Sequence, residues 1–260
     1  MSDASPERGR QFDLLAFAKA MKAQGRHRRL VDIIEKATSV CSAHEDLRAA
    51  LENLTALREI TRGSEERDEL REWAPACAHA LTAHSIVLYC RATQTSSNNR
   101  RSWFGLELLD DNQRELHRAV KRLRDDAIAH FGIGEAHPEG PLVREALILT
   151  FEGTRPRPIF HTAWSLNRAK FTFDFLLLVE AVRTIAAEKA RERMNEVLVE
   201  VAKTGSEDRS LGLLIEKYRF EPDAFFITPG AQEHIWERFG DDGVVTFVTA
   251  TAAPFYEREE

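Results

Sequence analysis

Cysteine is scarce in this sequence, with Cys41, Cys77 and Cys90 among 260 residues. Because their number is odd and their spacing matches none of the paired metal or redox motifs, we predict reduced, mostly buried thiols and no disulfide bond. The sequence also lacks a glycine-rich phosphate loop, a G-x-S-x-G nucleophile elbow, a zinc motif and an internal repeat. The enzyme classes that depend on those motifs are therefore excluded, and we expect neither a metal nor a cofactor.

Long apolar runs are absent as well. The longest, 173–182, contains Asp174 and Glu180 and is far shorter than a bilayer span. Residues 1–11 lack the apolar segment of a secretory signal. We therefore predict a cytoplasmic protein that has no membrane partner. With 43% hydrophobic residues, the chain can bury one substantial core and a smaller appended unit.

Positive charge is not in excess overall, since the net charge is −6. This argues against nonspecific nucleic-acid binding over the whole surface. Cations are nevertheless concentrated in one segment, at Arg114, His117, Arg118, Lys121, Arg122 and Arg124, and a second set lies around a polar loop, at Arg91, Arg100 and Arg101. These residues predict a local RNA- or phosphate-binding patch. The alternative is an ordinary solvated face, because Glu115, Asp125 and Asp126 dilute the positive charge.

Helical patterns dominate the first part of the chain. Residues 11–24 are amphipathic and stop at Gly25, and 28–40 repeat apolar residues at helical spacing. Ser42 and Glu45 form a capping-box pattern, which predicts a new helix to about residue 60.

A longer helix is predicted next, because Gly63 ends the preceding segment and Ser64 opens a pattern that continues to Arg91. Its apolar line predicts the buried face, at Leu70, Trp73, Cys77, Leu81, His84 and Leu88. We expect His84 to be a hydrogen-bonded core histidine, because His79 and His84 are five apart and do not form the usual metal-binding pair.

The second half of the chain mixes helices and strands. Segments 146–152 and 158–166 have the composition of two strands, which are joined across GTRPRP (153–158) into a hairpin. A long helix is predicted over 167–203. The tail contains a short helix near 208–218, a possible helix at 231–239 and a strand-like segment at 244–251. We predict a mainly α fold: a helical bundle (43–203) with an inserted β-hairpin, an N-terminal helical segment (1–42) and a small C-terminal α+β extension (204–260).

Residues 114–131 hold the most informative pair of the sequence, Arg124 and His130. Arg155 and His161 have the same spacing, but prolines between them rule out a regular helix. On a helix, the apolar residues of 114–131 form a stripe roughly 80° wide that must face a core. This stripe consists of Leu116, Val120, Leu123, Ala127 and Phe131.

Arg124 and His130 lie on opposite sides of that stripe, about 120° apart and separated by roughly 9 Å of helical rise. An unbroken helix cannot bring their side chains together. Either the helix ends or bulges before His130, as Gly132 and Gly134 would allow, or a second copy completes the site across a two-fold axis.

The chemistry of the two residues fits RNA cleavage without a metal. An imidazole titrates near neutral pH and can exchange a proton with the ribose 2′-hydroxyl or the leaving oxygen, which suits His130. A guanidinium offers paired donors for phosphate oxygens, which suits Arg124. Asp126 could hold the imidazole, and Asp125 could orient the guanidinium. The alternative is that both are structural, with Arg124 as a helix-end cation and His130 as a hydrogen-bonded boundary residue.

The pattern of Arg124, the polar Asp125, a short spacer (126–129) and His130 resembles the HEPN superfamily of helical-bundle ribonucleases and nucleotide-binding proteins. The segment HSIVLYCR (84–91) is also similar to the preceding helix of several HEPN-like prokaryotic proteins. The resemblance covers about 64–203 of the chain. It implies a metal-independent endoribonuclease, usually a symmetric homodimer with both sites at the interface, in which His130 and Arg124 act on the 2′-hydroxyl and the scissile phosphate.

Such a protein would serve as a toxin or defence effector, with an antitoxin or another protein as its partner. The alternative is a non-catalytic HEPN-like scaffold that recognises a nucleotide or a protein. His117 lies close to the helical line of Arg124, so it is a candidate phosphate contact together with Lys121. We nevertheless expect the side chain of His117 to be solvated.

Overall fold

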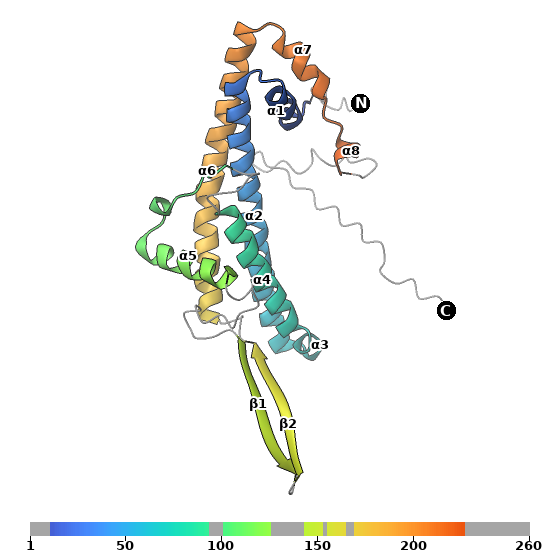
Figure 1. The fold of residues 1–260 in the computed structure, drawn as a ribbon, viewed down its shortest axis with the longest axis vertical. Helices are drawn as coiled ribbons and strands as arrows, with labels where there is room; N and C mark the ends of the chain where they lie inside the picture. The colour runs from blue at the N-terminus through green and yellow to red at the C-terminus, as the bar shows by residue number, and fades with distance from the viewer. Residues whose placement is uncertain (1–10, 94–100, 126–142, 153–154, 165–168, 227–260) are drawn as a thin grey trace, which may run out of the picture. The chain divides into compact units, whose positions relative to one another are not determined.

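The protein is described by a computed structural model, which covers residues 11–93, 101–125, 143–152, 155–164 and 169–226 (Figure 1). The fold is mainly helical and has a two-stranded antiparallel sheet, so the predicted fold class is confirmed. The chain divides into two compact units, Ser39–Ala190 and a second that joins Met1–Thr38 with Arg191–Glu260. Two 39-residue helices, α2 (Arg28–Glu66) and α6 (Ala169–Glu207), contribute to both units.

The unit Ser39–Ala190 is built around one hydrophobic core. Its helices α4 (Ala74–Ala92) and α5 (Asp111–Leu123) pack with α2 and α6 (Figure 1). The largest fully buried side chains of this core each stabilise the fold by roughly 1.5–3 kcal/mol. They are Leu47, Leu54 and Leu57 of α2, Ile86 and Tyr89 of α4, Leu123 of α5, and Phe175 and Leu178 of α6.

Helix α2 is continuous where the sequence predicted two helices. The predicted start at Ser42 is wrong, because Ser42 lies in the interior of α2. The carboxylate of Glu45 accepts a hydrogen bond of 3.0 Å from Nε of Arg48, one turn further along the same helix. The predicted end at Gly63 is also wrong. A glycine inside a helix costs only about 1 kcal/mol, which the packing of a long helix can offset.

The single helix predicted over 64–91 is divided into α3 (Asp68–Arg71) and α4. Pro75 explains the division. Proline is tolerated in the first turn of a helix but not in its interior, and Pro75 lies in the first turn of α4.

The buried face of α4 matches the predicted one only in part, since Leu88 is buried and Leu81 packs against the core. Trp73 is 65% exposed, and His84 lies at the surface, with Nδ1 3.1 Å from Nδ2 of Asn53. The core side instead carries small residues whose hydroxyls bond to carbonyl oxygens: Thr82 donates to Ala78 at 2.8 Å and Ser85 to Leu81 at 2.7 Å. The predicted core role of His84 is therefore wrong, because satisfied hydroxyls allowed a different face to be buried.

The predicted hairpin is confirmed, with strands β1 (Val143–Glu152) and β2 (Arg155–Trp164) in antiparallel register. Pro156 and Pro158 were expected in or beside the connection, and both lie within β2. Each strand of a two-stranded sheet has a free edge, where a residue without an amide hydrogen loses no ladder bond.

The other unit has a smaller core of its own. Helix α1 (Leu14–Ala23) starts at Asp13, whose Oδ1 accepts bonds of 2.9 Å from the amides of Leu15 and Ala16. As predicted, the helix ends before Gly25, which has a φ of 67°. Side chains from α1, α2, α6 and α7 form this core: Phe17, Met21, Leu30, Ile34, Val197 and Leu211.

The tail of this unit begins with short elements, α7 (Leu211–Ile215), a 3-10 turn η3 (Glu216–Tyr218) and α8 (Pro222–Phe226). The first two match the short helix predicted near 208–218. The features predicted at 231–239 and 244–251 lie outside the described residues. Within the described ranges, no helix has the length and apolar character that a membrane span requires.

Candidate functional site

Helix α5 carries the predicted cationic patch, and a capping box fixes its start. Oδ1 of Asp110 accepts from the amide of Gln113 at 2.8 Å, and the amide of Asp110 donates to Oε1 of Gln113 at 3.1 Å. The predicted apolar stripe is confirmed as far as α5 extends, since Val120 and Leu123 are fully buried and Leu116 packs against the same core. The charged side chains of α5 therefore face away from the core.

Arg124 follows the last residue of α5 and keeps a helical backbone conformation. Its Nε donates to Oδ1 of Asp125 at 2.7 Å, and a terminal guanidinium nitrogen donates to the same oxygen. One edge of the guanidinium is thus held by Asp125, and this contact does not use the other terminal nitrogen. His130 and Asp126 lie outside the described residues, so the meeting of Arg124 with His130 stays a prediction.

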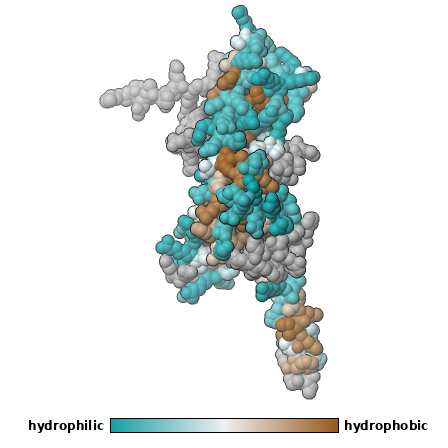
Figure 2. Space-filling model, turned by 90° about the vertical axis from the view of Figure 1, so that its left-hand side faces the viewer, coloured by the Kyte–Doolittle hydropathy of each residue, from teal (hydrophilic) through white to brown (hydrophobic). Residues whose placement is uncertain are grey.

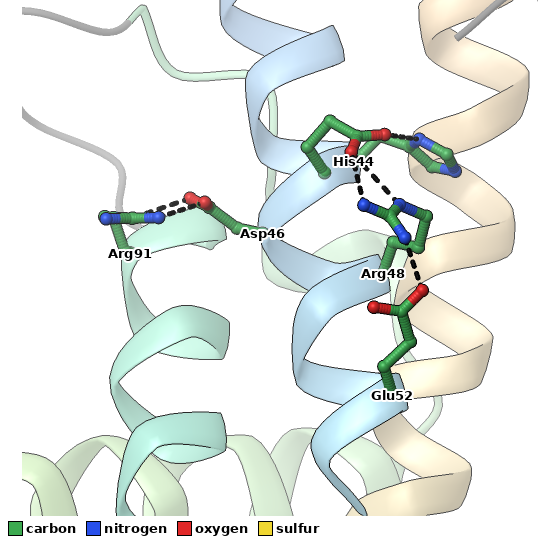
Figure 3. A network of polar contacts seen from close by, with 6 residues as sticks. His44, Asp46, Arg48, Glu52 and Arg91 are labelled. Atoms are coloured by element: carbon green, nitrogen blue, oxygen red, sulfur yellow. Dashed lines mark hydrogen bonds and ion pairs between the residues drawn. The ribbon is translucent and has the colours of Figure 1, made fainter. Parts of the chain in front are cut away.

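Arg91, a predicted RNA contact, lies at the end of α4 and is paired with Asp46 of α2 (Figure 3). Its Nε donates to Oδ2 at 2.8 Å, and a terminal nitrogen donates to Oδ1. The hydrogen bonds with Asp46 raise the pKa of Arg91. Because Asp46 is buried, Arg91 compensates a buried carboxylate, and an RNA phosphate would compete with that role.

Of the other two predicted contacts, Arg100 and Arg101, the structure describes one. The backbone amide of Arg101 donates to Oγ of Ser39 at 3.0 Å, and its side chain is exposed. Arg100 lies outside the described residues. The structure thus describes one of the two loop arginines and leaves its side chain at the surface.

His117 is not solvated, which corrects the prediction from the sequence. The residue is 4% exposed, and its Nδ1 lies 2.9 Å from Oη of Tyr89 in α4. The imidazole also packs against the rings of Tyr89 and Phe104, with centroids 5.7 and 5.3 Å away. The buried phenol explains the difference: it gives the imidazole a polar partner inside the core, which no local sequence pattern could reveal.

Burial, followed by the positive charges of Lys121 and Arg118, lowers the pKa of His117 to about 4. His117 is therefore neutral near pH 7, and its role is to pack and to hydrogen-bond. The raised pKa of the Tyr89 hydroxyl, which burial causes, keeps this partner neutral as well.

The pKa of His117 predicts that the protein loses stability in mild acid. The folded-state pKa of about 4 lies below the ordinary 6.5, so the unfolded chain binds the proton more readily. With respect to this group, the free energy of unfolding is highest above pH 6.5. It declines as the pH falls towards 4, and the loss is about 2 kcal/mol at pH 5. Urea unfolding at pH 7 and pH 5 should show this loss in the wild type and a smaller loss in His117→Gln. Equal losses in the two proteins would contradict the assignment.

A cavity of about 360 Å³ opens beside His117. Phe104 and Leu106 form an apolar part of its wall, and Thr93 at the end of α4 forms another part. The cations of α5 complete the lining, namely Arg118, Lys121 and Arg122. Within the described ranges, these three side chains form no ion pair, so their charge is available to an anion.

Two further observations extend the positive region around this cavity. Arg118 and Arg122 also line a second depression of about 440 Å³, together with Asp111, Arg114 and Glu115. Burial raises the pKa of the Cys90 thiol to about 12, and the charges of Arg124 and Lys121 act against this rise. The charges of Lys121, which lines the cavity, and of Arg124 thus both lower the pKa of the same buried thiol.

The cavity contains residues that the sequence reasoning missed. Lys121 and His117 were predicted as phosphate contacts, and Arg118 and Arg122 as part of the patch. Phe104 and Leu106 were not, although the apolar segment 102–109 after the polar loop was a visible signal. Its direction of packing, with Phe104 against His117, could not be read from the sequence.

The cavity has the size and chemistry of a site for a small anion with an apolar part. Its volume lies within the usual 300–1,000 Å³ of ligand sites. Arginine and lysine can hold phosphate oxygens, while the aromatic and aliphatic wall can contact a sugar or base. Comparison of the chain with family models, curated proteins and solved structures finds no match.

Proposed function

We propose that the protein is a metal-independent endoribonuclease of HEPN type, with Arg124 and His130 as its catalytic pair. The observation that supports this most is the cavity whose three cations, Arg118, Lys121 and Arg122, form no ion pair within the described ranges. They precede Arg124 on the same helical segment. RNA held at the cavity would therefore place a phosphate near the end of α5.

The proposed reaction uses each group for a separate task. His130 removes the proton from the ribose 2′-hydroxyl, whose oxygen then attacks the adjacent phosphorus. The bond from phosphorus to the 5′-oxygen of the next nucleotide breaks, and that oxygen takes a proton from water to leave as a hydroxyl. Arg124 stabilises the extra negative charge on the phosphate through the nitrogen that Asp125 does not hold. Asp126 orients His130. The expected products carry a 2′,3′-cyclic phosphate and a 5′-hydroxyl.

The biological setting belongs to the same proposal. The net charge of −6 favours one local RNA-binding patch over a broad basic surface. We expect a homodimer and a role as a toxin or defence effector, with an antitoxin or other protein partner. The free thiols Cys41, Cys77 and Cys90 are compatible with a cytoplasmic location.

A nuclease assay tests this proposal. Purified protein should cut single-stranded RNA in the presence of EDTA and leave single-stranded DNA of the same sequence intact, because DNA lacks the 2′-hydroxyl. Dependence on an added divalent cation, or equal cleavage of DNA, would contradict the proposed chemistry.

A second candidate function is the binding of a nucleotide without catalysis. The buried His117 favours it, because this imidazole of the cavity wall is neutral at pH 7 and is therefore suited to binding more than to proton transfer. Binding of a labelled mononucleotide together with complete stability of RNA in the nuclease assay would support this function over the first.

A further inference from the structure

The β-hairpin has one strongly apolar face. Because side chains alternate along a strand, the register places odd-numbered residues of β1 and even-numbered residues of β2 on the same side, as in the pairs Leu147–Phe160 and Leu149–Pro158. We call this side the apolar face of the hairpin. It includes Leu147, Leu149, Phe151, Pro156, Pro158 and Phe160, and the pair Glu145–Thr162 follows the pair Leu147–Phe160 on this side.

These side chains are uncovered within the described part of the chain. Leu147 is 75% exposed, Leu149 57%, Phe151 66% and Phe160 60%. Figure 2 shows the hairpin at the bottom of the view, where hydrophobic residues lie at the surface. The opposite side of the hairpin is more polar and includes Arg144, Thr150, Arg155, Arg157 and His161.

A hairpin with an exposed apolar face is expected to pack against another surface. An isolated two-stranded hairpin is marginally stable in water, and it becomes stable when its apolar face packs against another layer. The four exposed side chains present roughly 500 Å² of apolar surface, at the upper end of what a monomer usually exposes.

We propose that the apolar face packs against the same face of a second copy of this chain, related by a two-fold axis. A two-fold axis brings the same patch together from both subunits, and this patch has no charge between Leu147 and Phe151 that would repel itself. Two such faces would bury roughly 1,000 Å² in total, the lower limit for a specific interface. Both hairpins would be covered by the same contact.

Face packing fits the hairpin better than addition of a strand at the β2 edge. Oγ1 of Thr150 donates to the carbonyl oxygen of Arg157 at 3.0 Å, so the carbonyl of Arg157 points towards β1. The backbone groups of Pro156 and Pro158 therefore point to the outer edge of β2, because successive residues alternate. Without amide hydrogens there, this edge is a poor template for another strand. The proposal does not depend on ribonuclease activity.

Sedimentation velocity on the full chain over a range of concentrations tests the contact. We expect the wild type to dimerise, and Leu147→Glu to weaken dimerisation by at least about 10-fold, because the carboxylates would face an apolar layer. Ile148→Glu is the matched control. It changes a neighbouring exposed aliphatic residue in the same way, but on the opposite side of the hairpin, and should leave the dimer within about twofold of the wild type.

Several results would overturn this proposal. They are a monomeric wild type at all concentrations, a dimer that Leu147→Glu leaves intact, and equal weakening by both substitutions, which would indicate edge pairing. Flotation with vesicles of phosphatidylcholine and phosphatidylserine tests whether the apolar face binds a lipid surface. A monomer that binds these vesicles and loses binding on Leu147→Glu would assign the face to a lipid surface instead. Circular dichroism of each variant shows whether the helical fold is retained.

Discussion

Alanine in place of His130 should lower the rate of RNA cleavage by about 100- to 10,000-fold, the range for loss of a general acid or base. The affinity for RNA should change little, because the cations of α5 are retained. Single-turnover cleavage of a labelled single-stranded RNA in EDTA measures the rate, and fluorescence anisotropy measures the affinity.

His161→Ala is the matched control for this variant. His161 follows Arg155 at the same spacing at which His130 follows Arg124, but it lies in β2 with an exposed side chain. We expect it to cut RNA within about twofold of the wild-type rate, as surface substitutions usually have small effects. Loss of activity in His161→Ala, or full activity in His130→Ala, would contradict the assigned site.

Charge reversal in the cavity should have the second large effect. Arg118→Glu combined with Arg122→Glu replaces two phosphate donors by two repelling carboxylates, and should weaken binding of single-stranded RNA by at least about 100-fold at low salt. The dependence of affinity on salt should also become shallower, by roughly 0.7 in the logarithmic slope for each phosphate that is no longer neutralised. Anisotropy titrations at several salt concentrations measure both quantities.

Arg58→Glu combined with Arg62→Glu provides the control for that variant. These exposed residues of α2 are also four positions apart, and their reversal changes the net charge of the protein by the same amount. We expect a small loss of affinity, because neither residue lines the cavity and salt screens exposed charges that do not contact the ligand. If both double variants lose affinity equally, RNA responds to net charge and the cavity is not the binding site.

Parts of the fold could be predicted because they depend on local patterns. The end of α1 followed from an amphipathic segment that stops at Gly25, and the hairpin followed from two β-rich segments. Helix breaks were less predictable. Gly63 was given too much weight and Pro75 too little, because a glycine only weakens a helix whereas a proline restricts where it can begin.

In the candidate site, too, local sequence patterns predicted some features and could not predict those that depend on tertiary contacts. The cations of α5 could be found from their sequence clustering. The burial of His117 could not, because it depends on the hydroxyl of Tyr89, which is 28 residues away. His84 was assigned to a core that α4 fills in part with Thr82 and Ser85, whose hydroxyls bond to carbonyl oxygens one turn earlier in the same helix. Polar residues are buried where a partner satisfies them, and the spacing of apolar residues identifies neither kind of partner.

The termini of the RNA products test the central claim most directly. Mass spectrometry of an oligonucleotide cut in EDTA should show a 2′,3′-cyclic phosphate on one product and a 5′-hydroxyl on the other. A single 2′-deoxy substitution at the cut position should abolish cleavage there. Products with a 5′-phosphate and a 3′-hydroxyl, or cleavage that tolerates the 2′-deoxy nucleotide, would contradict a reaction in which Arg124 and His130 act on the 2′-hydroxyl and its phosphate.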